Sequence, residues 1–139
     1  MKINILVLLF TTCTVSSAFA SWNIECEGSD QANMNFTDTS FLGKPTLHFE
    51  SPSLSFNSSD LSAKVEVSDA IHDGGMFVTG SQMNWAGGQK ISFYIPELSL
   101  PNGSSDLRFD MQVTIETIDG RCSTLRLVQM QCTATKVCF

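Results

Sequence analysis

The stretch LRFDMQVTIE, residues Leu107 to Glu116, alternates apolar and polar side chains without a break. Successive side chains of a β-strand point to opposite faces, so a strict period of two is typical of a strand with one buried face and one wet face. The stretch is too short and too regular in this alternation to favour a helix. It predicts a long, half-buried strand and, with it, a fold built around a sheet.

A turn follows this strand at Asp119-Gly120. Asp-Gly between two strand patterns is a strong hairpin signal, and two loop lengths compete. A two-residue loop pairs Ile118 with Arg121, whereas a three-residue loop pairs Thr117 with Arg121.

The three-residue loop gathers the apolar residues of the hairpin on one face. It places Val113 opposite Leu125 and Met111 opposite Leu127. A slip of one residue would scatter them over both faces. It also puts Gly120 in a left-handed conformation, where glycine has no steric penalty. We therefore predict the three-residue loop.

The same alternation recurs through the rest of the chain after residue 20. It is clear in Leu61–Val67 and Ile91–Ile95, and turn-forming residues separate the patterned stretches. Shorter candidates are Trp22–Cys26, Met34–Thr37, Leu47–Glu50 and Leu54–Phe56. The prediction is an all-β fold: a single antiparallel β-sandwich or small β-barrel of about seven to nine short strands, carrying disulfides.

The first twenty residues have a different character. Lys2 precedes an apolar run from Ile3 to Phe10, and Ala18-Phe19-Ala20 follows. This order is typical of a secretory signal peptide cleaved after Ala20. We expect residues 1–20 to be removed and residues 21–139 to form one exported domain, secreted or periplasmic.

Cleavage would also remove Cys13 and leave Cys26, Cys122, Cys132 and Cys138. Four cysteines in an exported domain favour two disulfides. We prefer Cys26–Cys122 with Cys132–Cys138, and second Cys26–Cys132 with Cys122–Cys138. Cys122 and Cys132 lie ten residues apart, roughly 33 Å along a strand, which is too far for a bond between them.

Charge and composition exclude several classes of partner. The chain has a formal net charge of −6, and loss of Lys2 would make it about −7. Nucleic acid needs a basic patch, so it is not an expected partner. The leader is too short to span a bilayer, so no membrane span is expected. We expect no cofactor and no metal, because the cysteines lack the close spacing of zinc ligands.

Candidate binding residues are exposed aromatic and apolar side chains and one polar loop. They are Trp85, Tyr94, Leu98, Leu100, His72 and Asp73. Aromatic rings at loop edges often contact sugars or peptides. The other histidine, His48, lies between Leu47 and Phe49 and is expected on the solvated face.

No catalytic residue is assigned, because the sequence contains neither G-x-S-x-G nor H-E-x-x-H. The sequence favours a non-enzymatic binding or structural module of the cell envelope or extracellular space, with an unknown protein, glycan or small ligand as partner. Two alternatives are a carrier of a lipid-like ligand in an apolar cavity and a small hydrolase using His72 with Asp69 or Asp73.

Overall fold

One antiparallel sheet forms the protein in the computed structural model, which describes residues 21–38, 44–69, 74–101, 103 and 105–137. The sheet has nine strands in the order β4-β3-β2-β1-β9-β8-β7-β6-β5, so the all-β prediction is confirmed. The strands are β1 (Ser21–Gly28), β2 (Asn33–Asp38), β3 (Thr46–Ser51), β4 (Leu54–Asn57), β5 (Ala63–Asp69), β6 (Met76–Asn84), β7 (Gly87–Ile95), β8 (Leu107–Asp119) and β9 (Cys122–Val137). Two short 3₁₀ turns, η2 (Ser29–Gln31) and η3 (Glu97–Ser99), join strands.

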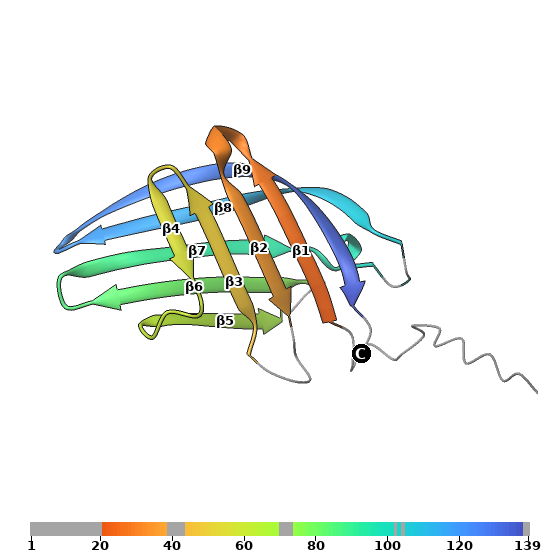
Figure 1. Ribbon diagram of the computed structural model, residues 1–139, viewed down its shortest axis with the longest axis horizontal. Helices are drawn as coiled ribbons and strands as arrows, with labels where there is room; N and C mark the ends of the chain where they lie inside the picture. Colours follow the sequence, from red (N-terminus) through yellow and green to blue (C-terminus); the bar gives the residue numbers. More distant parts are fainter. Residues whose placement is uncertain (1–20, 39–43, 70–73, 102, 104, 138–139) are drawn as a thin grey trace, which may run out of the picture.

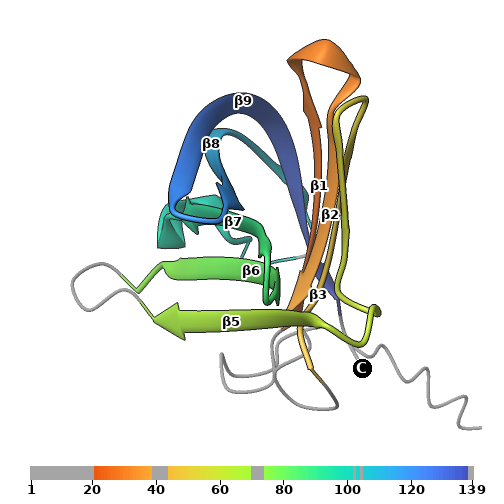
Figure 2. The same ribbon diagram turned by 90° about the vertical axis from the view of Figure 1, so that its left-hand side faces the viewer.

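The sheet curls over on itself to make two layers. β1 to β4 form one layer, β5 to β8 form the other, and their strands cross steeply (Figure 1). β9 arches from one layer to the other (Figure 2) and pairs with β8 along one edge and with β1 along the other. The result is a nearly closed, barrel-like sheet whose two edge strands are β4 and β5.

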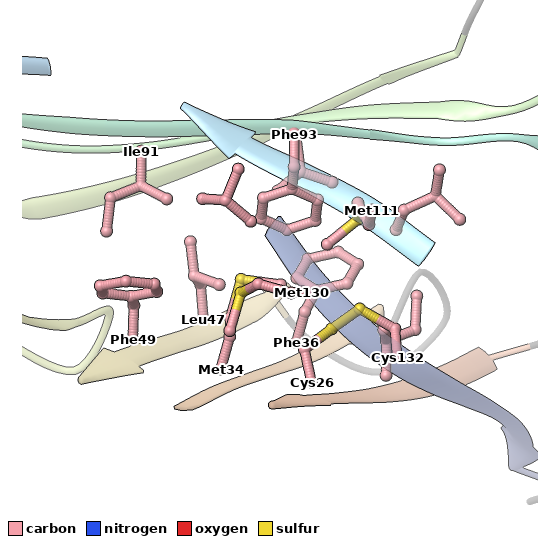
Figure 3. Close-up of a cluster of buried hydrophobic side chains, with 14 of the residues drawn as sticks. Cys26, Met34, Phe36, Leu47, Phe49, Ile91, Phe93, Met111, Met130 and Cys132 are labelled. Carbon is pink, nitrogen blue, oxygen red and sulfur yellow. A yellow bond between two sulfur atoms is a disulfide. The ribbon is translucent and has the colours of Figure 1, made fainter. Parts of the chain in front are cut away.

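Apolar side chains from the inner faces of both layers fill the space between them. Phe36 of β2 meets Phe93 of β7 edge to face, with ring centroids 5.6 Å apart. Such a contact adds about 0.5–1.5 kcal/mol to the free energy of burial. Figure 3 shows these side chains projecting toward one another, and the core is completed by residues of every strand that alternation predicted to be half-buried.

One disulfide joins the first and last strands, between Cys26 of β1 and Cys132 of β9. The two residues are directly opposite in the β1–β9 ladder, with Cα atoms 4.1 Å apart. The preferred pairing, Cys26–Cys122 with Cys132–Cys138, is therefore wrong, and Cys26–Cys132 of the second pairing is confirmed. The choice depended on the register of two strands at opposite ends of the chain, which alternation alone does not give.

Cys122 is exposed and free, so the expected second disulfide through Cys122 is not formed. Cys138 lies outside the described residues. β9 runs unbroken from Cys122 to Val137, which agrees with the argument that Cys122 and Cys132 are too far apart to bond.

The β8–β9 hairpin has a different register from either one predicted. Asp119 pairs with Cys122 around a two-residue loop, Gly120-Arg121, and Val113 lies opposite Val128. Gly120 has a φ of 59°, so the left-handed glycine is confirmed, but as the first residue of a shorter loop.

The physical reason for this register is the longer apolar series on β9. Its inner face consists of Val128, Met130, Cys132 and Ala134, all buried, so Leu125 and Leu127 lie on the outer face. Their exposed fractions are 66% and 59%. Burying these four side chains removes more apolar surface from water than burying the two leucines would. Alternation along β9 then places the leucines on the opposite, outer face.

The two layers approach closely over Gly80 of β6. A Cβ atom at this position would lie 2.7 Å from Leu47 Cδ2 and 3.0 Å from Phe56 Cε1, in the opposite layer. The absence of a side chain at Gly80 therefore allows the two layers to pack at this distance.

We predict that Gly80→Ala lowers the free energy of unfolding by about 1–3 kcal/mol, because the added methyl overpacks this contact. Ser81→Ala, on the outer face of the same strand, should change it by about 0.5 kcal/mol or less. Urea denaturation of both variants checks this, and equal stability of Gly80→Ala and the wild type would contradict the layer packing.

Candidate functional site

The predicted binding residues do not come together in one place. Trp85 lies in the β6–β7 loop and Leu98 lies in η3, at opposite ends of β7, and both are almost fully exposed. Tyr94 is half-buried on the outer face of β7, while Leu100 is buried with 7% of its surface exposed.

His72 and Asp73 lie outside the described residues, and of Asp69 only the backbone is described, at the end of β5. The hydrolase alternative stays a prediction for that reason.

A large polar groove of about 790 Å³ lies instead on the outer face of the sheet, across β8, β9, β1, β2 and β3. Outward-pointing polar side chains line it, and its floor includes both cysteines of the disulfide. The outer-face lining is Glu25, Glu27, Asn33, Asn35, His48, Arg108, Asp110, Gln131 and Thr133.

Strand register orders these side chains, together with Glu50 beside the groove, into two rows that run across the strands. In the first row, Glu50 pairs with Asn33, Asn33 with Glu27, Glu27 with Gln131, and Gln131 with Asp110. Carboxylates and amides therefore alternate over five neighbouring strands. We call these five residues the carboxylate row.

The second row lies two residues along each strand, on the same face. It contains His48, Asn35, Glu25, Thr133 and Arg108 in that order across the strands. His48 Nε2 lies 3.5 Å from Glu50 Oε2 and so links the two rows at one end. The exposure expected for His48 is confirmed.

The charges of the two rows are mostly negative. Glu25, Glu27, Glu50 and Asp110 are all exposed, against Arg108 as the one lysine or arginine among the two rows. Within the part of the chain that the structure describes, neither Glu27 nor Asp110 has an ion pair. Their negative charge is available to an incoming group.

The disulfide holds the floor of the groove. Cys26 lies between Glu25 and Glu27 on β1, and Cys132 lies between Gln131 and Thr133 on β9. Bonding the two cysteines fixes β1 against β9 and therefore fixes the distance between the polar side chains that flank them. Groups held in place on a rigid sheet lose little freedom when a ligand binds.

Sequence reasoning did not find this groove. Its residues are the polar halves of alternating strands, which by themselves indicate only a solvated face. What makes them a site is their alignment across five strands, and that alignment depends on the β1–β9 and β1–β2 registers.

A second surface, at the end of β6 to β9 near the β6–β7 and β8–β9 turns, carries several apolar side chains among polar ones. Met83, Ile118, Leu125 and Leu127 all lie on the outer face, and Gly88 separates Met83 from Ile118. Trp85 lies beyond them at the tip of the β6–β7 loop. This surface is remote from the carboxylate row.

Among the described residues, no group of three or more His, Cys, Asp or Glu side chains is placed to hold a metal ion. None of the helical segments in the described ranges is long and apolar enough to cross a membrane. No protein-family model, no curated protein and no solved structure matches the chain.

We predict that Cys122 reacts with a thiol-alkylating reagent in the folded, unreduced protein, because its side chain is exposed and unbonded. Cys26 and Cys132 should be modified only after reduction and unfolding, since both are buried in the disulfide. Peptide mapping by mass spectrometry distinguishes the three sites. Recovery of Cys122 in a disulfide-linked peptide would contradict the assignment.

Proposed function

We propose that this protein is an exported, non-enzymatic binding module whose polar groove holds a basic, extended peptide segment of a partner protein. The observation that carries the proposal is the carboxylate row, in which Glu50, Glu27 and Asp110 alternate with amides across the sheet. Carboxylates accept charge-assisted hydrogen bonds from lysine and arginine, and amides can bond to a peptide backbone.

The spacing of the carboxylates supports an extended chain as the ligand. Adjacent strands lie about 4.8 Å apart, so carboxylates on every second strand are about 9.6 Å apart. An extended polyproline-type chain presents the same face every three residues, or about every 9.3 Å. A peptide crossing the strands with a basic residue at every third position would therefore meet each carboxylate in turn.

The lining of the groove favours a cationic ligand over the other partner classes. Carboxylates repel phosphate, so the expectation that nucleic acid is not a partner agrees with this chemistry. Sugars commonly stack on exposed aromatic rings, and the one aromatic residue of the lining, Phe109, is half-buried. Trp85 is too remote to serve the groove.

Export remains part of the proposal. A disulfide is compatible with an oxidising compartment, and Ala18-Phe19-Ala20 has the pattern of a cleavage site. We propose secretion, or retention in a periplasm, with residues 1–20 removed.

The carrier alternative receives less support from the described residues. The space between the layers holds large side chains, including Phe36, Phe49 and Phe56, each fully buried. A carrier needs an open apolar cavity at this place.

The test is a titration with a synthetic peptide that has lysine at every third position, compared with the same peptide carrying glutamine instead. We expect binding of the lysine peptide alone, weakening as salt is raised, because exposed charges are screened. Glu27→Gln and Asp110→Asn should each weaken binding by about two- to fivefold, the range for single exposed ion pairs.

Asp119→Asn is the matched control, since it removes one exposed carboxylate at the tip of the β8–β9 hairpin, outside the groove. It should leave the affinity unchanged. Equal binding of the lysine and glutamine peptides, or an equal loss in all three variants, would refute the groove as a site for basic peptides.

A further inference from the structure

The edge strand β5 has one side of its backbone unpaired. Ala63–Asp69 pairs with β6 on one side, and no strand of the described chain pairs with it on the other. In Figures 1 and 2, β5 forms the margin of its layer. An edge of seven residues offers a row of backbone donors and acceptors on which another strand can form.

The side chains of β5 alternate between charge and half-covered apolar surface. Lys64 and Glu66 lie on the outer face, with side chains 70% and 65% exposed. Val65 and Val67 point to the inner face, where they pack against the core but stay partly exposed. A strand added to this edge would cover the two valines.

We propose that β5 pairs with β5 of a second copy of this chain, antiparallel and centred on Val65, to form a symmetric dimer. In this register Lys64 lies opposite Glu66 of the second copy, and the symmetry repeats the pair. Val65 lies opposite its own copy, and Ala63 lies opposite Val67 of the other chain. The pattern of charge and apolar residues is therefore complementary to itself about Val65.

The neighbouring registers are disfavoured by the same charges. Centring the pair on Lys64 would set two lysines opposite each other, and centring it on Glu66 would do the same with two glutamates. Like charges directly opposite in a ladder are destabilising. The charges at the edge thus favour the register centred on Val65 over the registers centred on either adjacent residue.

An ion pair within each chain links the same two side chains. Lys64 Nζ lies 2.6 Å from Glu66 Oε1, and this hydrogen bond raises the pKa of Lys64 and lowers the pKa of Glu66. Both groups are therefore charged at neutral pH. In the dimer, the two lysines and two glutamates would form a set of four charges of alternating sign on the outer face.

Charged side chains on an edge often prevent pairing, and the charges of β5 have a different arrangement. A guarded edge typically carries a lysine or an inward-pointing charge that no incoming strand can match. Here both charges point outward, and a second copy supplies an opposite charge for each. The proposal is independent of the groove, which lies across β8, β9, β1, β2 and β3.

The test is sedimentation velocity of the mature protein from about 1 µM to about 1 mM, since short interfaces of this kind are weak. We expect a reversible monomer–dimer equilibrium. Lys64→Glu should raise the dimer dissociation constant by about tenfold or more, because two attractive pairs become two repulsive ones. The double variant K64E/E66K restores opposite charges at both positions and should recover the wild-type constant.

Arg121→Glu is the control for net charge, because it makes the same change of charge at the exposed β8–β9 loop, four strands away from β5. It should leave the dissociation constant within about twofold of the wild type, as expected for distant charges in salt. Circular dichroism of each variant checks that the sheet is intact. A wild type that stays monomeric over the whole range, or a dimer as sensitive to Arg121→Glu as to Lys64→Glu, would overturn the proposal.

Discussion

The pairing of β1 with β9 is the contact on which the rest of the structure depends. Without it the chain would form two separate sheets, one from β1 to β4 and one from β5 to β9. The ladder runs for eight pairs, from Ser21 opposite Val137 to Gly28 opposite Met130. The disulfide in its middle closes a loop of 106 residues, and cross-links of that span stabilise a fold by about 4–5 kcal/mol in the chain-entropy model.

The same ladder creates the groove. Placing Cys26 opposite Cys132 also places Glu27 opposite Gln131, because the register is continuous. A slip of one residue would send Glu27 to the core and Cys26 to the surface, which neither side chain tolerates. One register therefore buries the disulfide on the inner face of the sheet and exposes the carboxylate row on the outer face. The constraint that stabilises the fold thus also positions the polar side chains.

Local alternation along the chain was enough to predict much of the fold. Ala63 to Val67 and Phe109 to Ile115 lie in strands whose apolar side chains turn toward the core as predicted, since period-two patterns need no knowledge of the partner strand. Leu61, the first residue of the predicted Leu61–Val67 strand, instead lies fully exposed in the turn before β5, because the strand begins only at Ala63. The predicted register of the C-terminal hairpin is wrong because Leu125 and Leu127 are apolar but exposed. The prediction placed these two leucines in the core instead of the buried series that begins at Val128. Propensity cannot distinguish a core leucine from a surface one when the strand extends beyond the core.

The candidate site was harder to predict than the fold. Trp85 and Leu98 are exposed, yet they lie at opposite ends of β7, so exposure did not imply a common surface. Glu27 of β1 lies about a hundred residues before Gln131 and Asp110 of the β8–β9 hairpin, and the three become neighbours only through two registers. Sites of this kind are properties of strand pairing, and a single sequence does not specify long-range pairing.

The most direct test of the β1–β9 register is a nuclear Overhauser measurement of Hα–Hα contacts in the oxidised protein. Cys26 and Cys132, with Cα atoms 4.1 Å apart, have the close spacing of a non-hydrogen-bonded pair, in which the Hα atoms face each other. The structure predicts strong contacts between Cys26 and Cys132 and, two residues along, between Ile24 and Ala134. Contacts of Ile24 with Thr133 or Thr135 instead, or none between β1 and β9, would contradict both the closure of the sheet and the carboxylate row.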